Sequence, residues 1–127
     1  MSLGFRIAIG RCDCRKPYGD PISAKACAVI DARLESWRKR LPADLAAVPA
    51  EAYEDERVEG HVITFGTHRH VLETGDTLLV FQALVHTWTR PTFLSLGAVG
   101  RMYAEGLLVS PRGTVERAPD EVMWPFR

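Results

Sequence analysis

The order of hydrophobic patterns along this chain constrains its fold more than any other feature. A short apolar segment at 4–10 precedes a polar loop at 11–20, and a long helical pattern follows from Pro21 to Leu41. From Val58 onward, hydrophobic residues instead recur at every second position, which is the spacing of β-strands. This order predicts an α+β domain in which an antiparallel sheet of about five strands packs against one long helix.

The helix has clear sequence signals at both ends. Asp20 is a suitable N-cap, Pro21 suits the first helical position, and Pro42 ends the pattern. The apolar residues within it recur at alternating spacings of three and four and so form one stripe, made of Cys27, Ile30, Leu34, Trp37 and Leu41. The basic run at 38–40 suits the C-terminal end of a helix dipole. We therefore expect one long helix with a single buried stripe.

The charge pattern argues against a nucleic-acid-binding protein. The formal net charge is zero, and the basic run at 38–40 is explained by its place at the helix end. Partners made of nucleic acid are thus not expected.

Between this helix and the strands, we expect a short second helix within 42–53, bounded by Pro49, and a solvated loop at the acidic residues 54–56.

A long hairpin follows this region. Strands are predicted from Val62 to Leu72 and from Thr77 to Thr89, with Gly75 in the left-handed conformation of the turn between them. If Leu72 faces Asp76 across the turn, six apolar residues share one face, which we expect to lie against the helix: Ile63, Phe65, Leu79, Phe81, Ala83 and Val85.

The last third of the chain is also rich in strand-forming residues. We expect a third strand at 92–99, a turn at Gly100-Arg101, a fourth strand at 102–109 and a polar tail. A helix over 93–103 is the alternative, because its apolar residues are spaced by threes. Two glycines weaken a helix there, so strands are favoured.

The four histidines all belong to the hairpin, which raises the question of a metal site. His68 and His70 share a strand face, but His86 pairs six residues away from His68, or about 20 Å along the sheet. Two ligands do not complete a metal site. We expect no metal, and expect His68 and His70 to face solvent or a ligand.

The three cysteines and the apolar segments indicate the compartment. Cys12 and Cys14 are too close in sequence to join distant segments, so we expect reduced thiols, with Cys27 in the core. No apolar run approaches the roughly 20 residues of a membrane-spanning helix, and the N-terminus lacks the features of a signal peptide. We expect one cytoplasmic domain over residues 1–127.

Three segments resemble the hotdog-fold acyl-CoA thioesterases of the 4-hydroxybenzoyl-CoA type. Residues 6–13 are similar to the first strand of that family, which runs into a catalytic aspartate, and 75–80 to the Gly-Asp-x-Leu that opens its third strand. Residues 100–106, together with 118–121, resemble its last hairpin and tail. The resemblance implies a hotdog-like sheet wrapped around the central helix.

The resemblance also implies a catalytic carboxylate. Asp13 would attack the thioester carbonyl or activate water, and a backbone amide at the helix N-terminus would stabilise the oxyanion. Asp20 is the alternative carboxylate, although it is also suited to cap the helix. Glu35 is a third candidate, although a surface ion pair with Arg38 also explains it. The loop at 14–20 departs from the family pattern.

Six residues are candidate substrate contacts: Lys16, Tyr18, His68, His70, Trp88 and Arg90. Arg112 is a further basic residue that could contact coenzyme A phosphates. The implied function is hydrolysis of an acyl-CoA or acyl-carrier-protein thioester by a bacterial homodimer or tetramer that uses neither a metal nor another cofactor.

Two other classes of function stay open. One is a non-catalytic helix-on-sheet protein, of a binding or immunity type, that recognises a protein or small-molecule partner. The other is a dehydratase or isomerase that uses His68 or His70 as acid and base. The first alternative predicts that loss of Asp13 or Asp20 leaves function intact.

Overall fold

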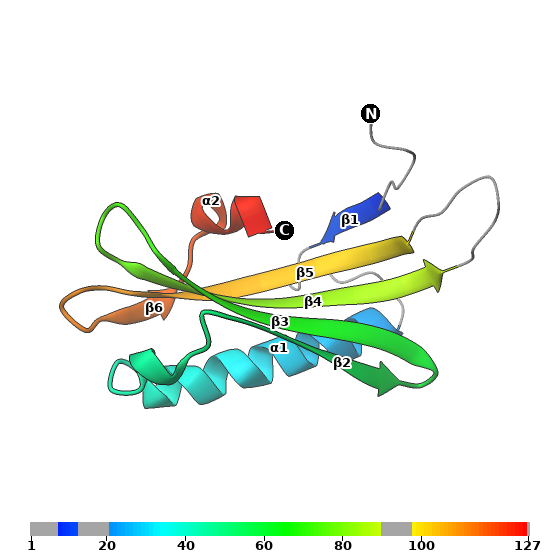
Figure 1. Cartoon of the computed structure of the whole chain (residues 1–127), viewed down its shortest axis with the longest axis horizontal. Coiled ribbons are helices and arrows are strands. Elements are labelled where there is room, and N and C mark those ends of the chain that lie inside the picture. Colours follow the sequence, from blue (N-terminus) through cyan, green and yellow to red (C-terminus); the bar gives the residue numbers. More distant parts are fainter. Residues whose placement is uncertain (1–7, 13–20, 90–97, 127) are drawn as a thin grey trace.

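The structure, a computed structural model, describes residues 8–12, 21–89 and 98–126. In chain order its elements are β1 (Ala8–Cys12), α1 (Pro21–Arg40), the 3₁₀ turn η1 (Leu45–Ala47), β2 (Glu51–Val58), β3 (His61–Val71), β4 (Thr77–Thr89), β5 (Ala98–Val109), β6 (Val115–Arg117), α2 (Asp120–Met123) and η2 (Trp124–Phe126). The strands form one sheet in the order β1-β5-β4-β3-β2, with β6 also paired to β5 (Figure 1). Strands β2 to β6 are antiparallel, and β1 runs parallel to β5. The α+β prediction is confirmed.

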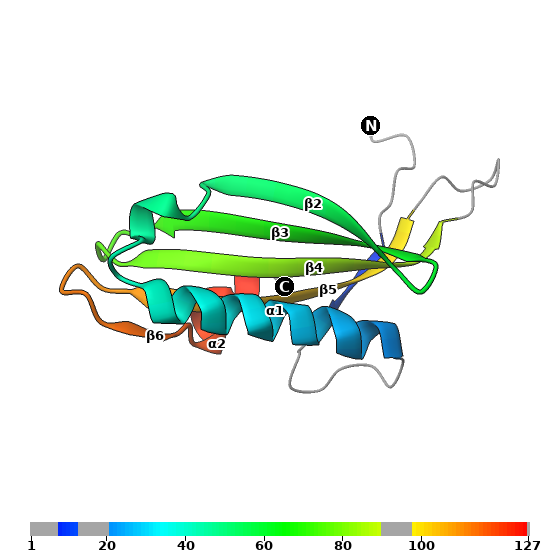
Figure 2. The ribbon, with the colours of Figure 1, turned by 90° about the horizontal axis from the view of Figure 1, so that it is seen from below.

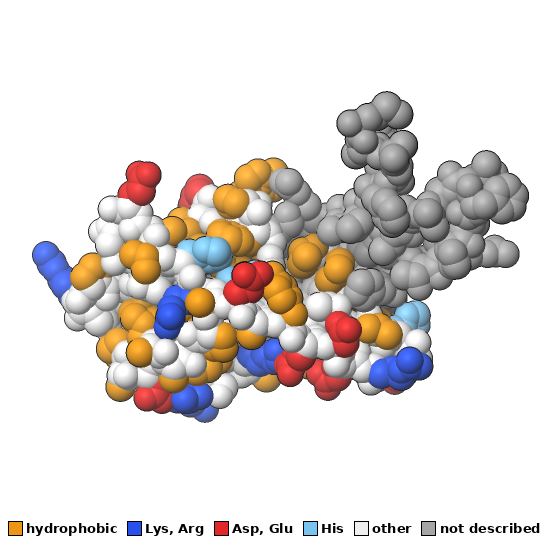
Figure 3. Space-filling view, viewed as in Figure 1, with side chains coloured by type: hydrophobic (Ala, Val, Ile, Leu, Met, Phe, Trp, Pro, Cys, Tyr) orange, Lys and Arg blue, Asp and Glu red, His pale blue; other side chains and the backbone are white. Residues whose placement is uncertain are grey.

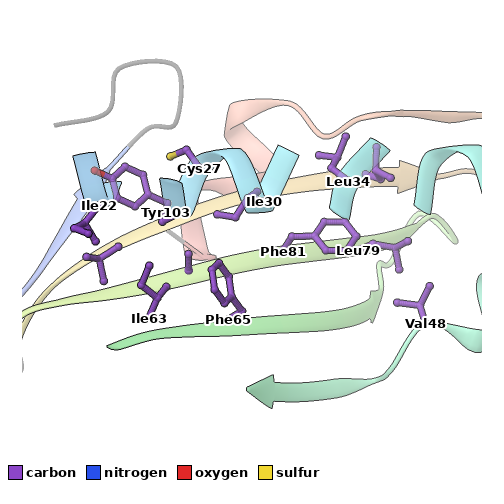
Figure 4. Close-up of a cluster of buried hydrophobic side chains, with 14 of the residues drawn as sticks. Ile22, Cys27, Ile30, Leu34, Val48, Ile63, Phe65, Leu79, Phe81 and Tyr103 are labelled. Atoms are coloured by element: carbon purple, nitrogen blue, oxygen red, sulfur yellow. The ribbon is translucent and has the colours of Figure 1, made fainter. Parts of the chain in front are cut away.

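Helix α1 lies across one face of the sheet, which we call the inner face. It packs on β4 and β5 and leaves β2 to one side (Figure 2). Cys27, Ile30 and Leu34 of the predicted stripe are buried, and Trp37 and Leu41 are partly buried against the same core. All six sheet residues predicted to face the helix belong to this core, and most of them are visible beneath α1 (Figure 4). The single long helix and its buried stripe are therefore confirmed.

The β3–β4 hairpin has the predicted register. The Leu72 amide donates to the Asp76 carbonyl at 2.8 Å, and Gly75 has φ 87°, in the left-handed region. Ile63 pairs with Val85 and Phe65 with Ala83. Glycine at the turn and strict alternation on both sides were enough to define this hairpin from sequence.

A second apolar cluster covers part of the opposite, outer face of the sheet. It contains Leu78, Val80, Ala104, Ala118 and Met123, with partly buried residues such as Phe126 packed against it. The prediction of a polar tail was therefore wrong. After a turn at 110–114 the chain forms β6, and α2 and η2 then return over the outer face. These elements are too short to show a period in the sequence.

The region before β3 also differs from the prediction. The expected second helix is only the three-residue turn Leu45–Ala47, and the expected acidic loop belongs to edge strand β2. Seven of the eight residues of β2 are exposed, so the strand lacks the alternation that reveals a half-buried strand. It is joined to β3 by the two-residue turn Glu59–Gly60, and both residues have positive φ.

Strand β5 runs without interruption through Gly100 and Arg101, so the predicted turn there was wrong. Arg101 pairs with Val85 of β4 on one side and with Gly10 of β1 on the other. This pairing on both sides holds an extended backbone despite the glycine. The helical alternative is wrong for residues 98–103, and 92–97 lie outside the described residues.

Two findings bear on the expected compartment. Cys27 is disulfide-bonded, which contradicts the expectation of reduced thiols. The chain's other cysteines, Cys12 and Cys14, have side chains outside the described part of the structure. No helix among the described residues is both long and apolar enough to cross a membrane.

Candidate functional site

The structure describes only part of the site that the sequence suggested. Asp13, Lys16, Tyr18, Asp20 and Arg90 lie outside the described residues. Trp88 belongs to β4, next to an irregularity in its pairing with β5, but its side chain is also outside the description. The geometry of the proposed carboxylates therefore stays a prediction.

Glu35, the third candidate carboxylate, is exposed on α1. Its Oε1 lies 3.6 Å from Nη1 of Arg38, one turn further along the helix. This is the surface ion pair that the sequence suggested as the alternative to catalysis, and it leaves Glu35 without a buried setting that would tune it for chemistry. Arg112 is likewise exposed, in the turn before β6.

His68 and His70 share the outer face, as the alternation of β3 predicts. Their rings are stacked with centroids 5.8 Å apart. Tyr53 of β2 contacts His68 edge to face at 5.2 Å, and Phe126 of η2 lies 4.9 Å from His70. We call these four side chains the ring row. It joins the edge of the sheet to the C-terminal segment, a contact between distant segments that no local pattern reveals.

The ring row contains two polar atoms that are notable for their setting. The Nε2 atoms of His68 and His70 are buried, and within the described part of the chain neither has a hydrogen-bond partner. Buried polar atoms usually have a partner, so these two nitrogens are exceptions within the described part of the chain. Among the residues the structure describes, no three metal-ligating side chains come together.

Tyr53 adds a phenol to this row. Partial desolvation raises the pKa of Tyr53, and a hydrogen bond to the Glu51 carboxylate raises it further, as does the negative charge of Glu51. The tyrosine side chain is nevertheless 58% exposed. The protonated phenol of Tyr53 can donate a hydrogen bond to, and accept one from, a partner that contacts this face.

On the inner side of the sheet, a hollow separates α1 from the edge strand β2. The Arg33 guanidinium lies 4.6 Å from the centroid of the Phe65 ring and forms an ion pair with Glu54. The sequence did not suggest this site, because its walls depend on the placement of β2, which was not predicted as a strand.

A buried carboxylate was also missed. Glu105 of β5 is 2% exposed, and its Oε2 lies 3.3 Å from Nη2 of Arg117 on β6. The same guanidinium nitrogen lies 3.6 Å from Asp31 of α1. The arrangement connects the helix, the sheet and the C-terminal hairpin, which is the geometry of a structural contact.

Comparison with protein-family models, with curated proteins and with solved structures finds no match.

Proposed function

We propose that this protein hydrolyses an acyl thioester, of coenzyme A or of an acyl carrier protein, with a carboxylate and without a metal. The observation that carries the proposal is the order of elements. One strand, one long helix laid across the sheet and the meander β2 to β5, followed by the short strand β6, resemble the order of elements expected for a hotdog fold. The three resembling sequence segments add to this support, because residues 75–80 and 100–106 fall at the start of β4 and in β5.

In this proposal the reactive groups lie on the segment between β1 and α1. Asp13, or Asp20 in its place, attacks the thioester carbonyl or activates water, and an amide at the N-terminus of α1 stabilises the oxyanion. Lys16, Tyr18, Trp88 and Arg90 contact the substrate. The active form is a homodimer or tetramer.

The test is release of free coenzyme A thiol from a panel of short, long and aromatic acyl-CoAs. We expect turnover by the wild type and its loss in either Asp13→Ala or Asp20→Ala. Glu73→Ala, which removes an exposed carboxylate in the β3–β4 turn, is the matched control and should keep full activity. Absence of turnover across the panel, or full activity in both aspartate variants, contradicts the proposal.

The ring row favours a second candidate function, a binding protein that recognises a partner through its outer face. Tyr53 is exposed, and two buried imidazole nitrogens beside it have no described hydrogen-bond partner. In that case Tyr53→Ala weakens partner binding, while Asp13→Ala and Asp20→Ala do not. The two sets of variants therefore separate the two functions.

A further inference from the structure

The hollow between α1 and β2 is a small, partly enclosed space of about 210 Å³. Polar and apolar groups contribute about equally to its lining, which consists of Arg33, Pro49, Ala52, Tyr53, Glu54, Phe65 and Thr67. It exists because α1 lies over β4 and β5, so that the inner side of β2 has no helix above it (Figure 2). Pockets for drug-sized ligands are generally larger than this, so the space suits a compact ligand.

Arg33 gives this hollow its chemical character. Its side chain is 28% exposed, and the guanidinium is held over the ring of buried Phe65 at 4.6 Å. Stacking on an aromatic face fixes the plane of a guanidinium, and a fixed guanidinium can donate two parallel hydrogen bonds to a carboxylate. The hollow thus combines a positioned carboxylate-binding group with two neighbouring apolar side chains, those of Pro49 and Ala52.

In the free protein, Glu54 already supplies a carboxylate to Arg33. The Glu54 side chain is 60% exposed and lies on the edge strand. An ion pair this exposed is weak, so a ligand carboxylate that also buries an apolar body against the exposed residues Pro49 and Ala52 can replace it.

We propose that this hollow binds a small monocarboxylate with an apolar body, such as an aromatic acid, and that Arg33 binds the carboxylate in exchange for Glu54. The neighbouring charges select the ligand further. Among the described residues that line the hollow, Arg33 is the only cation, and both acidic and basic side chains are visible along the edge where α1 and β2 lie (Figure 3). A single cation matches the one negative charge of a monocarboxylate better than the multiple charges of phosphate. The site is independent of thioester hydrolysis.

The experiment is an NMR titration of ¹⁵N-labelled full-length protein with sodium benzoate. Benzamide, which has the same shape without the charge, and inorganic phosphate are the comparison probes. We expect saturable shifts with benzoate at amides lining the hollow, such as Ala52 and Thr67, at least tenfold weaker binding of benzamide, and no saturation with phosphate.

Variants assign the binding to Arg33. Arg33→Met keeps the aliphatic stem and should abolish benzoate binding, whereas Arg38→Met removes an exposed charge elsewhere on α1 and should leave it unchanged. Glu54→Gln removes the competing carboxylate and should tighten binding at least threefold.

Three results would overturn the proposal: equal binding of benzoate and benzamide, unchanged binding in Arg33→Met, or binding by Glu54→Gln that is no tighter than by wild type. If Arg33→Met does not fold, Glu54→Gln decides, because Glu54 is exposed and its replacement does not disturb the core.

Discussion

At the residue scale, Gly106 has the least room for a side chain among the described glycines. A Cβ atom built there would lie 2.6 Å from Sδ of Met123 and 2.8 Å from the carbonyl oxygen of Leu79. The methionine can move, but the carbonyl belongs to the backbone of β4 and cannot. Gly106 is thus required by the close packing of α2 and β4 around β5.

We predict that Gly106→Ala lowers the free energy of unfolding by about 2 kcal/mol, a typical cost of overpacking a core. Gly60→Ala is the matched comparison, because a Cβ at Gly60 meets nothing within 4 Å and the cost there is only that of its φ of +82°. Urea denaturation measures both. Equal losses in the two variants would contradict the packing argument.

At the element scale, the sequence was informative wherever burial imposes a period. Helix α1 and the β3–β4 hairpin each bury one face, so their apolar residues recur at 3.6 or 2 residues. Strand β2 buries neither face and β6 is only three residues long, so neither has such a period. Gly100 gave a false turn signal, because pairing of β5 on both sides outweighs the local preference of glycine.

In the candidate site, too, the sequence predicted what alternation along one strand determines and missed the contacts between strands and segments. The shared face of His68 and His70 followed from alternation alone. Their contacts with Tyr53 and Phe126 did not, because these contacts depend on β2 and η2, which the sequence did not reveal. The Arg33–Glu54 pair was missed for the same reason.

The disulfide at Cys27 is an element-scale feature, since it ties α1 to another segment. Either remaining cysteine would close a short loop, and closing a loop of that size is worth about 3 kcal/mol in the unfolded chain. We predict that reducing agent lowers the thermal midpoint of the wild type and leaves Cys27→Ser unchanged. Intact-mass analysis after alkylation without reduction checks the bond itself, and three alkylated cysteines would show that it does not form.

At the scale of the whole molecule, the sheet is covered on both faces, but by elements of very different size. The 20-residue helix α1 covers the inner face, and the short α2 and η2 cover part of the outer face. The outer cover is held by Met123 in the second apolar cluster and by a hydrogen bond from the Gln82 side chain to the Phe126 carbonyl at 2.8 Å. None of the residues of the inner core belongs to α2 or η2.

We therefore predict that deleting residues 119–127 leaves a folded chain with an exposed apolar patch, formed by Leu78, Val80 and Ala104. Exposed patches of this kind promote association, so the truncated protein should bind a hydrophobic dye and sediment as larger species than the full chain. Far-UV circular dichroism should change little. Trp124→Ala is the control, because that residue is 62% exposed and its loss uncovers no core.

A truncated chain that sediments as wild type and binds no dye would show that the outer face needs no cover. Loss of all secondary structure would instead show that the two cores fold as one unit.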